Sequence, residues 1–251
     1  MSSESRAGSG AGSGPGSGPG PSDSPMLLLG ALDAEVEAFK EHIDGAKETG
    51  WREYRFLEGA IRGQAVVVSR CGVGKSLSAM LTQHLIDRYT PSAIIFTGVA
   101  GALNPELEIG DTVVARTCMQ HDLDARALGF ELGEVPYTSY RILEGDRDLV
   151  ERALTCRPSN GSVIAGHVLT GDSFIVTSKD DSHRYLREDL GGDAVEMEGA
   201  SVGLVATVND IPFVVIRTIS DKADTSASIN FAKFVKKASR NAWEFVDHLL
   251  P

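Results

Sequence analysis

Cysteine is scarce in this chain of 251 residues, which contains three in all. Cys71, Cys118 and Cys156 lie far apart and none belongs to a CxxC pair, so the sequence predicts neither a disulfide framework nor a zinc site. The N-terminus also lacks the charged and apolar segments of a secretory signal. These absences predict a cytoplasmic protein whose three thiols are free and buried.

Basic residues are outnumbered, with 24 Lys and Arg against 35 Asp and Glu, and the formal net charge is −11. Such a charge disfavours binding to nucleic acid or to an anionic membrane surface. No apolar run reaches the roughly 20 residues that a membrane-spanning helix needs. We therefore expect neither nucleic acid nor membrane as a partner.

The chain divides into a tail and one folded region. Residues 1–25 are almost all Gly, Ser, Pro and Ala, a composition that predicts a flexible segment. The chain as a whole is 42% hydrophobic, which suffices for one sizeable core, and we assign that core to a single domain over residues 26–251.

Apolar runs and helical patterns alternate along the folded region. The patterns predict strands over residues 26–30, 51–58, 64–70, 92–97, 111–119, 162–170 and 212–220. They predict helices from residue 31 to 43, over 75–89, 146–154 and 229–249, and directly after Gly199. This order indicates an α/β fold, a three-layer α/β/α sandwich around a mostly parallel, partly mixed sheet.

Two finer expectations concern the segments between these elements. In the helix over residues 75–89, the spacing predicts a buried stripe of Leu77, Met80, Leu81, His84 and Leu85. Residues 121–140 show no regular pattern, and a loop of this length in a compact domain is usually functional.

Acidic and small residues gather at predicted strand ends. Glu196 and Glu198 flank Met197, and residues two apart on a strand share a face, so both carboxylates are predicted to point into one cleft. Four further strands end in small or acidic residues, at 30–35, 98–102, 171–175 and 220–221. Ligands of parallel sheets bind beyond such carboxyl ends, so one cleft is favoured over a solvated acidic turn.

Two motifs suggest other chemistry and fail on spacing. Residues 72–76, Gly-Val-Gly-Lys-Ser, look like the end of a phosphate-binding loop, but Ser69 stands where that loop requires Gly. Lys75 is therefore predicted to be a surface residue at the start of a helix. His121, Asp122 and Asp124 lack a second His at ligand spacing, which favours a loop over a metal site.

Six segments together resemble the 5′-methylthioadenosine/S-adenosylhomocysteine nucleosidases, within the nucleoside phosphorylase family. They are Gly-Ala-Leu-Asp-Ala-Glu-Val from Gly30, Gly-Val-Gly-Lys from Gly72, Thr-Gly-Val-Ala-Gly-Ala from Thr97, Thr-Gly-Asp-Ser-Phe-Ile from Thr170, Val-Glu-Met-Glu-Gly-Ala from Val195 and Arg-Thr-Ile-Ser-Asp-Lys-Ala-Asp from Arg217. They follow the family's order and spacing and cover nearly everything after residue 25.

The resemblance implies a hydrolase that cuts the N-glycosidic bond of an adenine nucleoside, with no metal or organic cofactor. It assigns Glu35 to deprotonating the attacking water and Asp221 to protonating the leaving adenine. It implies substrate contacts from Leu32, Val73, Ala100, Gly101, Phe174, Ile175, Met197, Glu198 and Phe231. Ser220 is expected to orient Asp221, and Arg217 to pair with Glu196 or Glu198.

The resemblance also implies a homodimer, in which residues 130–136, with Phe130 and Pro136, close the pocket of the partner subunit. Two departures leave the 5′-substituent of the nucleoside open. Val99 stands where many members have Ser or Thr, and Phe130 stands where a Tyr is common.

Two alternatives remain beside the hydrolase. A phosphorylase needs arginines for phosphate, yet Asp33 and Glu35 occupy the first loop and Phe96 occupies the position of the second arginine. A catalytically weak nucleoside-binding protein is disfavoured because Glu35, Glu198 and Asp221 are all present.

Overall fold

A computed structural model describes residues 24–176, 182–223 and 227–251 of the chain, without the side chains of residues 227–233 and 235–237. The predicted flexible tail therefore lies outside the described residues, apart from Ser24 and Pro25. Within the described ranges, no helix combines the length and apolarity that crossing a membrane would require.

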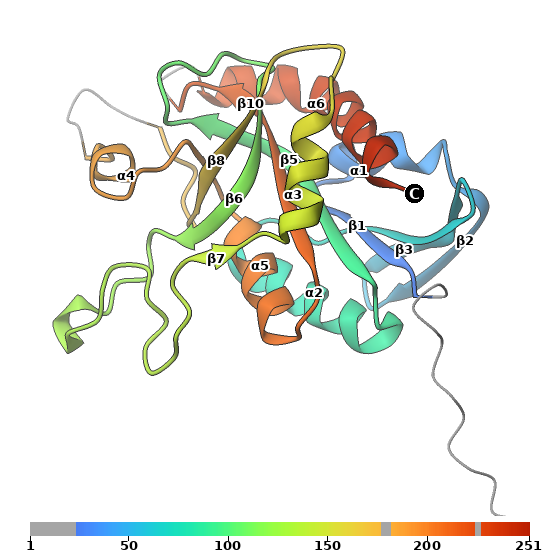
Figure 1. The fold of residues 1–251 in the computed structure, drawn as a ribbon, viewed down its shortest axis with the longest axis horizontal. Coiled ribbons are helices and arrows are strands. Elements are labelled where there is room, and N and C mark those ends of the chain that lie inside the picture. The colour runs from blue at the N-terminus through green and yellow to red at the C-terminus, as the bar shows by residue number, and fades with distance from the viewer. Residues whose placement is uncertain (1–23, 177–181, 224–226) are drawn as a thin grey trace, which may run out of the picture.

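The described residues form one ten-stranded sheet with helices on both sides (Figure 1). The strands are β1 (Met26–Gly30), β2 (Asp44–Trp51), β3 (Tyr54–Ile61), β4 (Gln64–Arg70), β5 (Ala93–Ala102), β6 (Thr112–Gln120), β7 (Leu143–Glu144), β8 (Val163–Thr170), β9 (Ala194–Glu196) and β10 (Phe213–Asp221). The helices are α1 (Asp33–Lys40), α2 (Lys75–Tyr89), α3 (Arg147–Thr155), α4 (Tyr185–Glu188), α5 (Gly199–Val208) and α6 (Ala227–Leu249), with a 3-10 turn at Arg126–Leu128.

The strand β1 shows how the three layers arise. All five of its residues are buried, and neighbouring residues point to opposite faces of the sheet. Leu27 and Leu29 join the core under α2 and α5. Met26 and Leu28 join the core under α1, α3 and α6. The sheet is therefore covered on both faces, as the alternation of strands and helices predicts.

The sheet closes on itself at the end where the site lies. Strand β5 pairs with β10, β10 with β6, β6 with β8, β8 with β9, and β9 again with β5. Because β6 is antiparallel to β10 and parallel to β8, strand β8 runs against β10. In a flat sheet its carboxyl end would lie at the opposite edge. The short β9 closes the ring and brings the end of β8 to the ends of β5 and β10.

Several predicted boundaries were wrong. Residues 44–51 form strand β2, which the sequence did not indicate, and the turn of the next hairpin is Arg62-Gly63 rather than residues 59–63. Helix α1 ends at Lys40 rather than 43. In α2 the predicted stripe is only partly buried, since Leu77 is 42% and Met80 is 40% exposed.

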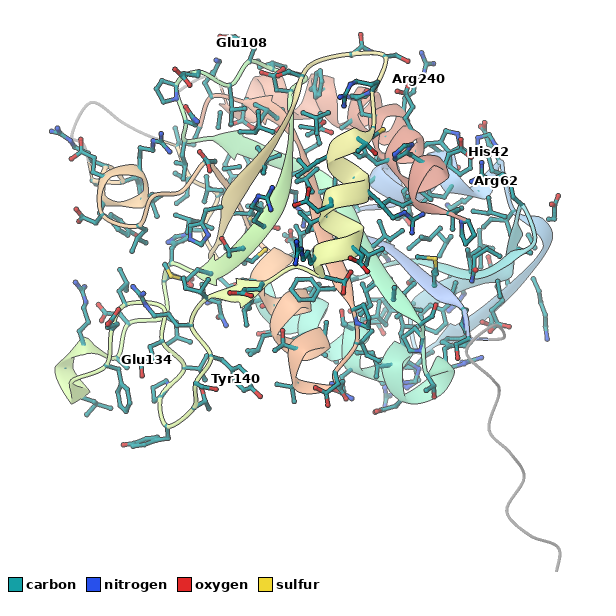
Figure 2. All side chains as sticks on the ribbon, in the orientation of Figure 1. His42, Arg62, Glu108, Glu134, Tyr140 and Arg240 are labelled. Carbon is teal, nitrogen blue, oxygen red and sulfur yellow. The ribbon has the colours of Figure 1, made fainter. Side chains whose placement is uncertain are left out.

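The segment 121–140 projects from the body of the molecule (Figure 1). Figure 2 places Glu134 and Tyr140 on this projecting loop. Apart from the 3-10 turn at Arg126–Leu128, the segment is irregular, as predicted. Its tip carries apolar side chains in solvent, with Leu128 70% and Tyr137 87% exposed.

Candidate active site

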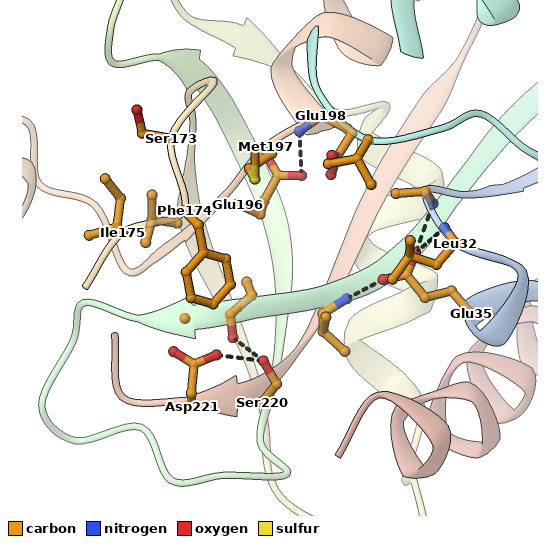
Figure 3. Close-up of a pocket in the computed structure, with 16 residues that line it drawn as sticks. Leu32, Glu35, Ser173, Phe174, Ile175, Glu196, Met197, Glu198, Ser220 and Asp221 are labelled. Carbon is orange, nitrogen blue, oxygen red and sulfur yellow. Dashed lines mark hydrogen bonds between the residues drawn. The ribbon is translucent and has the colours of Figure 1, made fainter. Parts of the chain in front are cut away.

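One cavity of about 280 Å³ lies where the strand ends converge (Figure 3). Its walls come from the segments after β1, β4 and β8, from the end of β5, from β9 and the residues after it, and from the end of β10. The lining residues are Ala31, Leu32, Glu35, Val73, Val99, Ala100, Gly101, Ser173, Phe174, Ile175, Val195, Glu196, Met197, Glu198, Ser220 and Asp221.

Glu35 is held by backbone N–H groups from two strand ends. Its Oε2 accepts hydrogen bonds from Ala31 N (2.7 Å) and Leu32 N (2.9 Å), and its Oε1 accepts one from Val99 N (3.1 Å). The carboxylate arises from the third position of α1 and binds the N–H of the residue before the helix, an arrangement typical of helix starts. Burial raises the pKa of Glu35, while Arg217 and these N–H groups act in the lowering direction.

A glycine makes this approach possible. A Cβ atom at Gly98 would lie 2.8 Å from Glu35 Oε1 and 3.0 Å from Arg217 Nη1. The absence of a side chain therefore lets the carboxylate and the guanidinium both reach the edge of β5.

Glu196 is saturated with donors. Arg217 donates to its Oε2 from Nε (3.1 Å) and Nη2 (2.7 Å), Gly199 N donates to both oxygens, and the Thr170 hydroxyl donates to Oε1. Arg217 is 1% exposed, and its guanidinium carbon lies 4.1 Å from the centre of the Phe96 ring. Arg217 thus pairs with Glu196, one of its two predicted partners. Glu196 lines the cavity without keeping an oxygen free of protein donors.

Glu198, in contrast to Glu196, has few hydrogen-bond donors around its carboxyl group. Among the described residues its Oε1 accepts one hydrogen bond, from Gly74 N at 2.8 Å, and Oε2 accepts none. Burial and the neighbouring Glu196 carboxylate raise the pKa of Glu198 to about 8. One oxygen of a side chain that is protonated near neutral pH therefore faces the cavity, where it can bind a ligand hydroxyl.

Asp221 lies at the end of β10 and is oriented by its neighbours. Ser220 Oγ donates to Asp221 Oδ2 at 2.7 Å, so the predicted orienting contact is present. Ala223 N donates to Asp221 Oδ1 at 2.8 Å. A Cβ atom at Gly101 would lie 3.0 Å from Oδ1, so glycine there leaves room for the acid.

The remaining walls are mostly apolar. The Phe174 ring lies between Ile175 and Asp221 in Figure 3, with Met197 and Glu198 on another side and Leu32 and Glu35 on a third. Phe174 is 47% exposed, so it lies at the mouth. The cavity therefore combines an apolar slot with carboxyl groups at several points on its wall, a combination that suits a flat base attached to a hydroxylated ring.

Most predicted site residues meet here, and some do not. Phe130 and Pro136 lie on the projecting loop and do not line this cavity. The side chain of Phe231 lies outside the described residues. Among the lining residues, Ala31, Ser173 and Val195 were not named as contacts, although each stands within one of the six segments.

Two polar residues behave differently from the prediction. Asp33 does not line the cavity but pairs with Arg70 at 3.3 Å, so the acidic lining of the first loop rests on Glu35 alone. Lys75 begins α2, but its side chain is only 17% exposed and is paired with carboxylates, so it is not a free surface residue.

The structure describes residues 121–124, where the sequence predicts a loop rather than a metal site. His121 is buried and its Nδ1 lies 3.2 Å from Tyr185 Oη. Asp124 pairs with Arg126. Across the described ranges, no group of three or more His, Cys, Asp or Glu side chains is arranged to hold a metal ion.

Comparison with known proteins defines the class. The profile of the Phosphorylase superfamily matches residues 25–251, and the chain belongs to this superfamily. A relative in Shewanella sediminis, a 5′-methylthioadenosine/S-adenosylhomocysteine nucleosidase, is 36% identical over 228 residues, covering 89% of this chain and 97% of the relative.

Solved structures agree. The nucleosidase of Colwellia psychrerythraea, in complex with adenine, matches with a TM-score of 0.85 and 32% identity over 90% of this chain and 94% of its own. The futalosine hydrolase of Helicobacter pylori matches with a TM-score of 0.83 and 28% identity over 90% and 97%. The similarity to the methylthioadenosine nucleosidases that the six segments indicate is thereby confirmed.

Proposed function

We propose that this chain hydrolyses the N-glycosidic bond of 5′-methylthioadenosine, of S-adenosylhomocysteine or of both, and releases adenine and a 5-thio-substituted ribose. The observation that carries the proposal is the placement of Glu35, Glu198 and Asp221 on separate sides of one cavity (Figure 3). Several relatives and solved structures that match the chain are named as nucleosidases of these two substrates, and one of the structures contains adenine.

Asp221 is the proposed general acid. It shares its end of the cavity with the Phe174 ring, which can stack on adenine. Protonation of the adenine ring at N7 lets the base leave as a neutral molecule. The Ser220 hydroxyl fixes the carboxyl group so that one oxygen, Oδ2, has a defined orientation.

Glu35 is the proposed general base for the attacking water. A base is most effective when its pKa lies near the working pH, and burial shifts the pKa of Glu35 upward in that direction. The three N–H groups hold the carboxylate in place before the substrate arrives, so no reorganisation is needed during the reaction.

Glu198 is the proposed ligand of the ribose hydroxyls, with Met197 packed beside it on the sugar. Cleavage of a glycosidic bond develops positive charge on the sugar ring. The Glu35 carboxylate in the cavity wall stabilises that charge electrostatically.

Water is favoured over phosphate as the nucleophile by the charges around the cavity. Among the described residues, no Lys or Arg side chain lines it. The Arg217 guanidinium is buried and already makes two hydrogen bonds to the Glu196 carboxylate. A phosphate dianion entering the cavity would meet carboxyl groups and no free cation of the described part of the chain, so phosphorolysis is disfavoured.

We further propose that the protein works as a homodimer whose projecting loop completes the pocket of the partner subunit. Leu77 and Met80 on α2, and Val73 just before it, place apolar side chains in solvent. Leu128 and Tyr137 do the same at the tip of the loop. Val73 also helps to line the cavity. A second copy is the partner that would cover both surfaces at once.

The predicted cytoplasmic location and the predicted absence of a cofactor stay predictions. The three cysteines are unpaired and buried, which agrees with a reducing compartment.

The test is release of adenine from methylthioadenosine by the wild type and by Asp221→Asn. We expect the variant to lose turnover by about 10²- to 10⁴-fold because the leaving base is no longer protonated. Binding of the nucleoside, measured by calorimetry, should persist. Asp247→Asn, on an exposed ion pair of α6, is the matched control. Full activity of Asp221→Asn would remove the proposed acid.

A further inference from the structure

Three segments meet around one ammonium group next to the cavity. Lys75 Nζ lies 2.6 Å from Asp122 Oδ1 and 3.9 Å from Asp172 Oδ2. The backbone closes the arrangement, because Lys75 N donates to Asp172 Oδ1 (2.8 Å) and Asp172 N donates to Asp122 Oδ2 (2.8 Å). We call these three residues the junction.

Each member of the junction belongs to a different part of the site. Lys75 follows Val73, a wall residue, and Gly74, whose N–H binds Glu198. Asp172 directly precedes the wall residues 173–175, which include the exposed Phe174. Asp122 lies at the base of the projecting loop, next to the buried His121.

The electrostatics favour a fixed geometry over a loose surface contact. The Lys75 side chain is 17% exposed, so solvent screens the pair with Asp122 only in part. Burial acts to raise the pKa of Asp122, but the hydrogen bonds from Lys75 and from Asp172 N outweigh it and lower that pKa. Asp172 accepts an N–H at the start of α2, where the helix dipole also favours a carboxylate.

The junction gives the lysine of the Gly-Val-Gly-Lys-Ser motif at residues 72–76 a role other than phosphate binding. A lysine that binds phosphate keeps its ammonium group free for the ligand, whereas Lys75 already faces two carboxylates. In the loop that precedes α2, the Gly74 N–H therefore binds Glu198. Lys75, which follows it, pairs with Asp122 and Asp172 next to the wall that carries Phe174.

We propose that Lys75 and Asp122 are positioning residues, which fix the wall carrying Val73 against the wall carrying Phe174 and thereby set the affinity for the nucleoside. The proposal rests on the proposed function, because it names the nucleoside as the ligand of these walls. Neither residue touches the reacting bond, since neither lines the cavity. Their loss should therefore raise KM and leave kcat nearly unchanged.

The experiment measures kcat and KM for methylthioadenosine in Lys75→Met, Asp122→Asn and the double variant. We expect KM to rise about tenfold in each single variant, with kcat within about threefold of the wild type. The double variant should be no worse than either single one, because residues of one network are not additive. Lys75→Arg keeps a cation and should recover most of the affinity.

Glu151→Gln is the control, since Glu151 lies on α3, pairs with the exposed Arg116, and belongs neither to the cavity nor to the projecting loop. Its KM should equal that of the wild type. Thermal unfolding of every variant separates a local effect on the walls from a general loss of stability.

An unchanged KM in Lys75→Met and Asp122→Asn would overturn the proposal. A fall in kcat as large as the rise in KM, in proportion to a lowered melting temperature of the variants, would overturn it as well. Additive losses in the double variant would also contradict a shared junction. If the wild type itself neither binds nor cleaves the nucleoside, the proposed function fails first and the junction proposal fails with it. A wild type that works beside variants that show no change refutes the junction alone.

Discussion

The floor of the cavity and the projecting loop differ in what surrounds their side chains. At the floor, Glu35, Glu196 and Arg217 are buried, and each is held by several hydrogen bonds from its own chain. On the loop, Leu128 and Tyr137 hold apolar surface in water. The floor is thus complete within one chain, whereas in the proposed dimer a partner subunit covers the loop. Variants of the floor should change chemistry or stability, and variants of the loop should change assembly.

The largest expected effect is on catalysis at the floor. Glu35→Gln removes the proposed base and also turns an amide toward N–H groups that require an acceptor. We expect kcat to fall about 10²- to 10⁴-fold. Glu37→Gln, two residues further along α1 in an exposed ion pair, should be unaffected. Steady-state adenine release decides, and an unchanged rate for Glu35→Gln would mean that the water is held elsewhere.

Arg217→Met should reveal how the floor is held together. Removing the guanidinium leaves Glu196 without its buried counter-charge, and losing one partner of such a pair typically costs about 3–5 kcal/mol. Urea unfolding measures this loss. Arg116→Met breaks an exposed pair with Glu151, and there we expect about 0.5 kcal/mol or less. Equal losses in the two variants would show that the buried pair has no special role.

The loop should respond in assembly instead. Leu128→Glu places a charge on a side chain that is 70% exposed in one chain, so the fold of the subunit should persist. If the loop enters the partner subunit, the dimer should dissociate about tenfold or more readily. Sedimentation velocity measures this, with Ile109→Glu as an exposed apolar control away from the loop. A Leu128→Glu protein that stays as dimeric as the wild type would contradict the proposed role of the loop.

The last expected effect is a change in how steeply stability depends on pH. The pKa of Glu198 is about 8 in the folded protein against an ordinary 4.5, so the folded state keeps a proton that the unfolded chain has released. The resulting stability is complete below pH 4.5 and is lost as the pH rises through 8. Glu198→Gln cannot titrate, so its free energy of unfolding should fall less over this range. Parallel curves for the two proteins would show that Glu198 is ionised in the fold.

Much of this organisation follows from local patterns in the sequence. The buried strands read as apolar runs, and α2 begins and ends at the predicted residues. Carboxylates that follow strands converge because strand ends meet at one place. The expected roles of the site residues came from the family resemblance of the six segments, because the spacing of residues in one segment does not indicate them.

The parts that were missed depend on pairing across the fold. Strand β2 is mostly exposed and carries no apolar alternation, so it exists because β3 offers an edge for pairing. Leu77 and Met80 fit the helical stripe by spacing, but only the packed structure shows which side of α2 faces the sheet. The roles of Glu196 and Glu198 diverge because Arg217, far along the chain, reaches one and not the other.

The junction could not be predicted from the sequence either, because its residues come from distant parts of the chain. Lys75 lies 47 residues from Asp122 and 97 from Asp172, and no local pattern connects the three. The parallel pairing of β6 with β8, which places Gln120 opposite Thr170, brings Asp122 and Asp172 together. The short β9 then links the end of β8 to the end of β5.

The most direct measurement of the central claim is adenine release from methylthioadenosine in phosphate-free buffer, repeated with phosphate while phosphorus NMR follows the products. We predict full release without phosphate, an unchanged rate when phosphate is added, and no sugar phosphate. Release that requires phosphate and yields a sugar 1-phosphate would contradict the hydrolytic role that the acidic lining of the cavity supports, to which no described Lys or Arg side chain belongs.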